Sequence, residues 1–217
     1  MNRRTLPVAV AAAATAALFL SACGGGGGKT NDKIAGSEQS ATPSAPASAS
    51  ASPSDTAGRP KITLPADFKN EFEGWTTGDP VKDALLSDIS QRINATDAAI
   101  ASDEAESAAI PFYYKGEALL GASTWIAKLK NDGLTPTGSA RYFNPQIEMF
   151  NETSAGVGYC SDEGKAFAKE RKTGKVLTTP VTDNSYVTYR IRVDKNPQGV
   201  WQTTQLVSQR GDKKCTP

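Results

Sequence analysis

Histidine is absent from this chain of 217 residues, and cysteine and methionine are scarce, at three and two residues. Without an imidazole to take the proton of a serine nucleophile, a Ser-His-Asp hydrolase is excluded. Zinc sites usually draw on histidine or on several clustered thiolates, and three scattered cysteines do not supply them. The sequence therefore predicts no metal site and no other cofactor.

An excess of charge of either sign is also missing. The chain has 24 basic and 23 acidic residues, and Arg3 and Arg4 account for two of the basic ones, which leaves 22 for the rest. Nucleic-acid surfaces need a clear basic excess, so we expect no nucleic-acid partner. One local basic cluster is interpreted as a solvated loop or strand edge: Lys165, Lys169, Arg171, Lys172 and Lys175.

Long hydrophobic runs are limited to one, from Leu6 to Leu20, and it is too short to span a bilayer as a stable helix. Arg3 and Arg4 precede it, and the small residues Ser21 and Ala22 follow it. This order of a positive region, an apolar core and small residues is typical of an export signal, which we predict for residues 1–22.

The glycine run that ends in Gly28-Lys29-Thr30 invites comparison with a phosphate-binding loop. That motif requires a glycine five residues before Gly28, where this chain has Cys23, and it requires a strand before the loop and a helix after it. Residues 31–40 are almost wholly polar and carry no apolar helical period. Nucleotide binding is therefore not predicted here.

The segment Leu20-Ser21-Ala22-Cys23 resembles the cleavage box of bacterial lipoprotein precursors. In that family the box cysteine receives a diacylglyceryl thioether and becomes the new N-terminus. The resemblance implies that Cys23 is lipidated, by palmitate-type acyl chains, and that the protein is anchored on the extracytoplasmic face of the cell membrane. Two acyl chains give durable anchoring where one gives only marginal binding. The alternative is an ordinary secretory signal with an incidental cysteine.

Composition divides the exported chain into a tether and a body. Residues 24–60 are mostly Gly, Ser, Ala, Thr and Pro, with Ile34 as the one large apolar side chain. Such a segment cannot bury enough surface to offset the entropy of ordering, so we predict a disordered tether over residues 23–60. Residues 61–217 are of the size of one domain with a single core.

If Cys23 is lipidated, Cys160 and Cys215 remain as an even pair in an oxidising compartment. A structural disulfide is the expected outcome there. Closing a loop of about 55 residues would stabilise the fold by about 4 kcal/mol in the chain-entropy model.

Helical patterns come first in the body. Asp79-Pro80 is a helix start, and an apolar stripe at helical spacing follows it: Val81, Leu85, Ile89, Ile93 and Ile100. A second helical region follows Ser102 and breaks near Pro111. A third runs from about residue 116 to 131, with Trp125 interpreted as a core residue, and Asp132-Gly133 ends it.

After Gly133 the apolar period becomes two, which predicts strands. The strongest signal is a hairpin in which residues 187–193 and 200–208 flank the turn Asn196-Pro197-Gln198-Gly199. Shorter strands are predicted at 137–143, 147–150 and 155–161. The turn also matches part of a calcium-loop pattern that starts at Asp194, but the twelfth position is Gln205, so the hairpin interpretation is preferred.

Helices before antiparallel strands are typical of an α+β fold in which helices pack on one face of a sheet. The order resembles the cone of the nuclear-transport-factor-two-like (cystatin-like) superfamily, where helices are cradled by a curved sheet. The body is also similar to uncharacterised lipoproteins of high-GC Gram-positive bacteria, on three motifs of structural character: Trp75-Thr76-Thr77-Gly78-Asp79-Pro80, Tyr159-Cys160-Ser161-Asp162-Glu163 and Gln198-Gly199-Val200-Trp201. This second resemblance implies no known activity.

Related cones in other families perform eliminations and isomerisations with an Asp or His base and Tyr or Asp donors. Here a base would have to be a carboxylate such as Glu148 or Asp162. We predict no catalytic residues and no enzyme, and instead a membrane-anchored, non-catalytic binding or interaction module. The predicted partners are the bilayer, through acylated Cys23, and an exported protein, a cell-wall polymer or a small apolar ligand.

Two alternatives remain. One is a small pocket enzyme of the isomerase or dehydratase type, which a buried carboxyl of raised pKa beside a tyrosine would favour, whereas a closed apolar interior would favour the binding module. The other is the solute-binding subunit of an importer, which normally needs about twice this length.

Overall fold

The computed structural model describes residues 58–217 except residue 105. The predicted signal peptide (1–22), the lipidation site Cys23 and all but the last three residues of the predicted tether lie outside this range. The described elements, in chain order, are β1 (Phe68–Phe72), α1 (Pro80–Ala101), α2 (Ala109–Tyr113), α3 (Gly116–Asn131), β2 (Leu134–Asn151), β3 (Ser154–Glu170), β4 (Val176–Leu177), a 3-10 helix (Asp183–Ser185), β5 (Tyr186–Lys195) and β6 (Trp201–Arg210).

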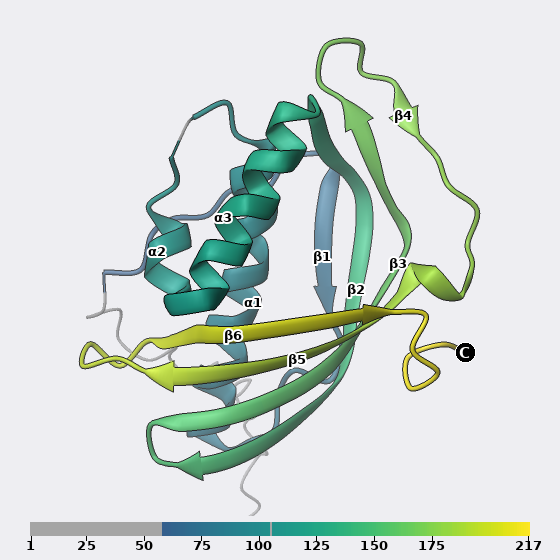
Figure 1. Cartoon of the computed structure of the whole chain (residues 1–217). Helices are drawn as coiled ribbons and strands as arrows, with labels where there is room; N and C mark the ends of the chain where they lie inside the picture. Colours follow the sequence, from purple (N-terminus) through teal and green to yellow (C-terminus); the bar gives the residue numbers. More distant parts are fainter. Residues whose placement is uncertain (1–57, 105) are drawn as a thin grey trace, which may run out of the picture. The chain divides into compact units, whose positions relative to one another are not determined.

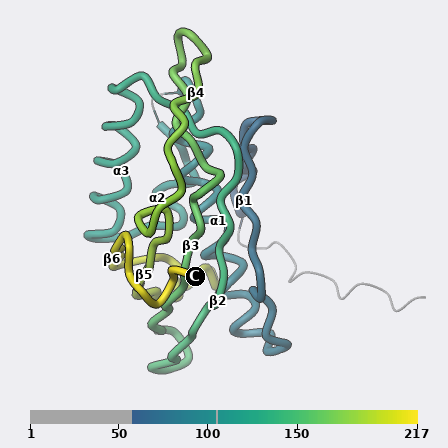
Figure 2. The backbone as a smooth tube through the Cα atoms, turned by 90° about the vertical axis from the view of Figure 1, so that its right-hand side faces the viewer, coloured from purple at the N-terminus to yellow at the C-terminus, as the bar shows by residue number. Residues whose placement is uncertain are grey.

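The architecture is mixed α+β, as the sequence predicts. A curved, unclosed sheet has the strand order β1-β2-β3-β5-β6, with β4 paired to β3, and α1 and α3 lie against one of its faces (Figure 1). All pairs are antiparallel except β1–β2. In the view turned by 90°, β1 runs at the edge of the fold, next to α1 (Figure 2). The arrangement is consistent with the nuclear-transport-factor-two-like cone.

Strand β1 is the element that the sequence analysis missed, and it precedes the helices rather than following them. It has five residues, and Phe68, Asn70 and Phe72 turn inward while Lys69 and Glu71 are exposed. A strand this short, with a polar residue in the middle of its inner face, gives a weak alternation signal. Its pairing with β2 brings Asn70 against α1.

Helix α1 begins where the sequence predicts. The Asp79 side chain accepts hydrogen bonds from the backbone N–H groups of Val81 (2.9 Å) and Lys82 (3.2 Å), and Pro80 occupies the first turn. Because proline lacks an N–H, it suits this position, where no intrahelical partner exists. The buried face of α1 then packs Leu85, Leu86 and Ile89 against the sheet.

The second helix is only five residues long, and α3 differs from its prediction in one respect. Trp125 is 49% exposed and Leu120 is 71% exposed, so the interpretation of Trp125 as a core residue was wrong. The apolar residues of α3 extend around most of the helix, whereas only one stripe packs against α1, α2 and β6. Ala118 is fully buried there, and Leu119 and Ile126 are partly buried.

Strands β2 and β3 form a longer hairpin than predicted. The two short strands expected at 137–143 and 147–150 are one strand, interrupted by register shifts between Ser139 and Arg141 and between Phe143 and Gln146. The second irregularity contains Asn144 at φ 53 and Pro145, which disrupt the alternation without ending the strand. The β5–β6 hairpin is confirmed, with Asn196 Oδ1 accepting from Gln198 N and Val200 N in the turn.

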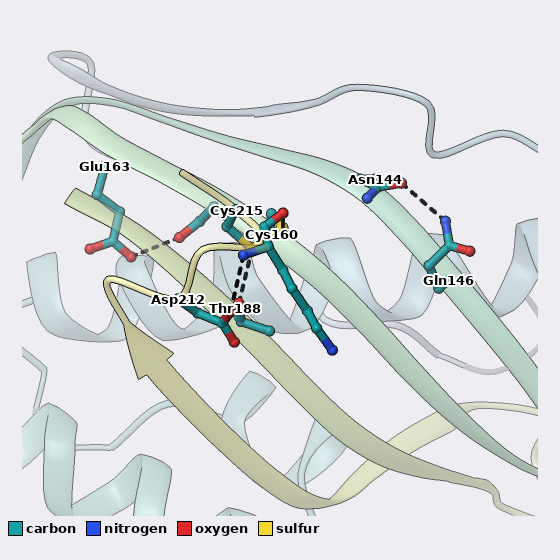
Figure 3. Close-up of a disulfide and its surroundings, with 9 residues drawn as sticks. Asn144, Gln146, Cys160, Glu163, Thr188, Asp212 and Cys215 are labelled. Carbon is teal, nitrogen blue, oxygen red and sulfur yellow. Dashed lines mark hydrogen bonds between the residues drawn. A yellow bond between two sulfur atoms is a disulfide. The ribbon is translucent and has the colours of Figure 1, made fainter. Parts of the chain in front are cut away.

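Cys160 and Cys215 form the predicted disulfide, with 5.5 Å between their Cα atoms (Figure 3). It ties the C-terminal segment to β3, and the Cys215 sulfur also lies 3.0 Å from the Thr188 hydroxyl on the adjacent β5. Both cysteines are buried. Among the helices of residues 58–217, none is both long and apolar enough to cross a bilayer.

The predicted basic cluster is solvated except at Lys169, which pairs with Asp67, and at Arg171. This side chain is 21% exposed and donates to the carbonyl oxygens of Ala101 (3.1 Å) and Ile100 at the end of α1. No basic residue of α1 occupies its own last turn. Arg171 therefore supplies the cation that favours this C-terminus.

Candidate functional site

Neither carboxylate that the sequence offered as a base lies in the interior. Glu148 is exposed on β2. Asp162 is partly exposed, pairs with Arg141 at 3.4 Å and accepts from Gly164 N at 2.9 Å. These contacts are those of surface polar groups, so neither carboxylate faces the interior as a base would have to.

A different carboxyl, Asp97 of α1, faces the space between the helix and the sheet. Its Oδ2 accepts a hydrogen bond of 2.7 Å from the side-chain amide of Asn70 on β1. Within the described chain no second donor reaches Asp97, although the residue is surrounded by protein and keeps only partial exposure. Burial raises the pKa of Asp97 to about 7, the Asn70 hydrogen bond opposes this rise, and the nearby charge of Glu163 adds to it.

Two elements hold Asp97 in place. It lies four residues after Ile93 on the inner side of α1, and the same Asn70 amide that reaches Asp97 also donates to Asn94 at 3.0 Å. Since Asn70 is fixed by the pairing of β1 with β2, opposite Ala140, the strand and the helix together orient the carboxyl. Asn70 is therefore the link between the sheet edge and the acid.

Tyrosines of the sheet face the same space. Tyr159 on β3 stacks on Tyr189 of β5, with 5.0 Å between ring centroids, and Tyr142 of β2 lies 6.2 Å from Tyr159. Burial raises the pKa of Tyr142 well above its usual value, and the charge of Asp97 is the next contribution. The Tyr142 hydroxyl has no hydrogen-bond partner among residues 58–217, so its proton is available to a ligand.

Arg92 is a buried cation one turn before Asp97. It is 3% exposed and donates to the hydroxyls of Tyr114 (2.8 Å) and Tyr159 (2.5 Å), while its Nε has no partner in the described structure. Burial raises the pKa of Tyr159 to about 12, against the opposing effect of Arg92. Because the Tyr159 oxygen accepts from Arg92, its own proton is polarised for donation.

Glu163 is another carboxylate near these tyrosines, and three side chains donate hydrogen bonds to it. It accepts from Arg210 (2.6 Å), Ser161 (3.1 Å) and Tyr189 (3.3 Å). Its side chain is 20% exposed. Of the two carboxyl groups near these tyrosines, Glu163 thus has three donors and Asp97 has one, and Asp97 is the one suited to exchange a proton.

Two cavities lie close to this interior. One, of about 340 Å³, is bordered by Trp75 and by Ser87 of α1, and another, of about 440 Å³, lies between α2, α3 and the end of α1. Among the described residues, no group of three or more Cys, Asp or Glu side chains is arranged to hold a metal ion.

Comparisons with known proteins give a likeness in fold only. No family model matches the chain, and no curated protein matches it. The intermembrane space region of the chloroplast protein ARC6 is 14% identical over 57% of this chain and 92% of that chain, with a TM-score of 0.41. A ketosteroid isomerase-like protein from Erwinia carotovora atroseptica SCRI1043 is 15% identical, over 58% and 93%, with a TM-score of 0.40.

A third structure, described as a candidate ketosteroid isomerase from Shewanella frigidimarina NCIMB 400, is 16% identical over 64% of this chain and 99% of that chain, with a TM-score of 0.32. At these identities and scores, none of the three transfers a residue role to this chain.

The prediction that the protein is not an enzyme is corrected. Asp97 has a raised pKa and lies near Tyr142, and a carboxyl of raised pKa beside a tyrosine is the feature that the sequence analysis gives as favouring a pocket enzyme over a closed binding module. One signal could have found Asp97. The apolar stripe of α1 runs through Ile93 to Ile100 and skips the position between them, where Thr96 and Asp97 stand.

Proposed function

We propose that the described domain binds a small carbonyl compound between α1 and the sheet and moves a proton on it, with Asp97 as the general base. The observation that carries this proposal is a carboxyl with a single hydrogen-bond donor and a pKa of about 7. A base is most effective when its pKa lies near the working pH, because it is then both available and strong enough. An isomerase or dehydratase type of reaction follows from such a group.

The step can be written with the residues at hand. A carbon–hydrogen bond next to the carbonyl breaks, and its proton moves to Asp97 Oδ1. The electron pair of that bond stays on the substrate, which becomes an enolate. In this proposal the hydroxyls of Tyr142 and Tyr159 donate to the enolate oxygen, and the hydrogen bond from Arg92 makes the Tyr159 hydroxyl a stronger donor. Return of the proton to another carbon gives an isomer, and its delivery to a leaving hydroxyl gives elimination of water.

The structure supports this proposal over a purely structural role for Asp97 through an energetic argument. Keeping a carboxyl with one donor inside a fold is unfavourable at neutral pH, since its ionised form is poorly solvated. Residues that cost stability in this way are concentrated at functional sites.

The test is hydrogen–deuterium exchange of butan-2-one in D₂O, followed by proton NMR, with the full chain. We expect the wild-type protein to accelerate exchange at the carbon next to the carbonyl and Asp97→Asn to return the rate to that of buffer. Asp162→Asn, a matched change at the surface carboxylate, is expected to keep the wild-type rate. Equal rates for the wild type and Asp97→Asn would overturn the proposal.

We also propose that this domain works at the extracytoplasmic face of the membrane, held by acylated Cys23. The support is the sequence pattern around residues 20–23 alone. Intact-mass analysis of the mature protein is expected to give a chain that begins at a diacylated Cys23, and an unmodified N-terminus at another residue would refute the anchor.

A further inference from the structure

The cavity of about 440 Å³ lies on the helical side of the molecule, where α2 is beside α3 (Figure 1). Neither Asp97 nor any tyrosine borders it, so it is separate from the proposed proton-transfer site. We call it the α3 groove, because α3 forms the whole of one bank. Its floor consists of buried and partly buried apolar side chains from all three helices: Ala99, Ile110, Leu119 and Ile126.

The apolar surface continues from the floor onto the exposed side of α3. Leu120 is 71% exposed, and the exposed residues Ser123 and Ala127 of the lining follow it at three- and seven-residue spacing. This spacing places the three residues on one face of the helix. From Leu120 to Lys130 the helix is about 15 Å long. An elongated apolar surface beside a helix suits a second helix, which packs a stripe of its side chains against it.

The bank opposite α3 is acidic. Glu104 and Glu106 border the groove there, and both are exposed. Neither carboxylate has an ion-pair or hydrogen-bond partner in the described part of the chain. Lys130, the one basic residue of the lining, is already engaged, because its Nζ donates to the carbonyl oxygens of Ala99 (3.4 Å) and Glu104. The groove therefore presents two unpaired negative charges beside an apolar floor.

Several contacts hold the two banks together. Lys130 joins α3 to the end of α1 and to Glu104. Arg171 pairs with Asp103 at 3.1 Å, and the Ser102 hydroxyl accepts from Glu104 N at 3.0 Å. A surface that is held in place before a partner arrives loses less entropy when the partner binds.

We propose that the α3 groove binds a short amphipathic helix of a partner protein, with the apolar stripe of that helix on the groove floor and its lysine or arginine residues opposite Glu104 and Glu106. Charge complementarity selects this partner, since a basic flank is attracted to the acidic bank and an acidic flank is repelled by it. The interaction does not depend on Asp97, so it can be tested apart from the proposed function.

The probes are two fluorescently labelled helical peptides of equal length, one made of leucine and lysine and the other of leucine and glutamate, with leucines at the same amphipathic spacing. The readout is the Kd with the full chain, measured by fluorescence anisotropy. We expect the lysine peptide to bind about tenfold more tightly than the glutamate peptide, or better, and its affinity to fall as salt screens the acidic bank.

Ser123→Arg introduces a long, positively charged side chain on the α3 bank, from an exposed position that leaves the core unchanged. We expect it to weaken binding of the lysine peptide by about tenfold or more. Thr124→Arg is the matched control, because it adds the same charge at the next residue, which is exposed and does not border the groove. It is expected to change the Kd by less than about twofold.

The double variant Glu104→Gln with Glu106→Gln removes the charge of the acidic bank and keeps the shape of its side chains. We expect it to bring the Kd values of the two peptides to within about twofold of each other. Glu117→Gln with Glu152→Gln removes two exposed carboxylates outside the groove and is expected to keep the wild-type preference.

Equal binding of the two peptides to the wild type would overturn the proposal, and so would an unchanged Kd in Ser123→Arg or the absence of binding at about millimolar lysine peptide. Sedimentation velocity of the protein alone checks for a different occupant. We expect a monomer, and a dimer that Ser123→Arg dissociates would show that a second copy of the chain occupies the groove instead.

Discussion

Helix α1 has two aspartates nine residues apart on its inner side, Asp88 buried and Asp97 partly exposed, and they differ in what surrounds them. Asp88, 1% exposed, receives the Arg59 guanidinium at 3.0 and 3.2 Å and the backbone N–H of Trp201 at 2.9 Å. Asp97 receives one side-chain amide. A buried carboxylate with several donors stabilises the fold through its hydrogen bonds. A carboxyl with a single donor costs stability and is kept in place by the surrounding structure. The number of hydrogen-bond donors, rather than the degree of burial, distinguishes a structural carboxylate from a reactive one.

The same contrast runs along the rest of the helix. Around Asp88 the core is apolar, with Leu85, Leu86 and Ile89 packed under Trp201. Around Asp97 the interior contains Arg92 and three tyrosines. The first half of α1 therefore supplies stability, and the second half supplies the candidate chemistry.

Asp88→Ala is the change expected to destabilise the fold most. The change leaves the Trp201 N–H without its acceptor in the core and removes the carboxylate that neutralises Arg59. We expect a loss of about 3 kcal/mol in the free energy of unfolding, measured by urea denaturation at pH 7. A loss below about 0.5 kcal/mol would contradict the structural role of Asp88.

Asp97→Asn is expected to raise the free energy of unfolding rather than lower it. The folded-state pKa of about 7 lies above the ordinary value of 3.8, so the native state binds more protons than the unfolded state between about pH 4 and 7. Stability from this group is present below pH 4 and is lost as the pH rises to 7. Asparagine cannot ionise, so the variant should be more stable than the wild type at pH 8, by up to about 4 kcal/mol, and similar to it at pH 4.

Thermal unfolding of the wild type and of Asp97→Asn between pH 4 and pH 8 checks whether the variant is the more stable protein at high pH. Identical stability of the wild type and Asp97→Asn at pH 8 would show that the native state does not disfavour the ionised form.

A smaller effect is expected at the C-terminal end of α1, where Arg171 donates hydrogen bonds to the carbonyl oxygens of Ile100 and Ala101. Arg171→Ala should lower the free energy of unfolding by about 1 kcal/mol, because the hydrogen bonds and the favourable charge at the helix C-terminus are lost. Lys172→Ala, at the exposed neighbour, is the matched control and should change it by less than about 0.5 kcal/mol. Equal losses in the two variants would contradict the capping role.

Features of the fold that depend on residues close together in the sequence could be predicted from it. The Asp79-Pro80 helix start, the β5–β6 hairpin and its turn, and the α+β class all follow from local spacing. The Cys160–Cys215 bond follows from counting cysteines. Strand β1 and the continuity of β2 cannot be predicted in this way, because a five-residue edge strand and a strand with three irregularities depend on the sheet that they join.

The candidate site is hidden from the sequence for the same reason. Asn70 and Asp97 are 27 residues apart, and the tyrosines come from three strands that converge only in the sheet register. The sequence suggested Glu148 and Asp162 because they lie in or next to predicted strands, but the alternation of residues does not tell which face is inside when both faces carry polar residues. The interruption of the apolar stripe of α1 at Thr96 and Asp97 was the one local sequence signal of the site.

The most direct test of the central claim is a carbon-13 NMR titration of the side-chain carboxyl groups in the full chain, with the Asp97 signal identified by its absence from Asp97→Asn. We predict a midpoint near pH 7 for Asp97. A midpoint below about pH 5, within the ordinary range of aspartates in proteins, would contradict the account.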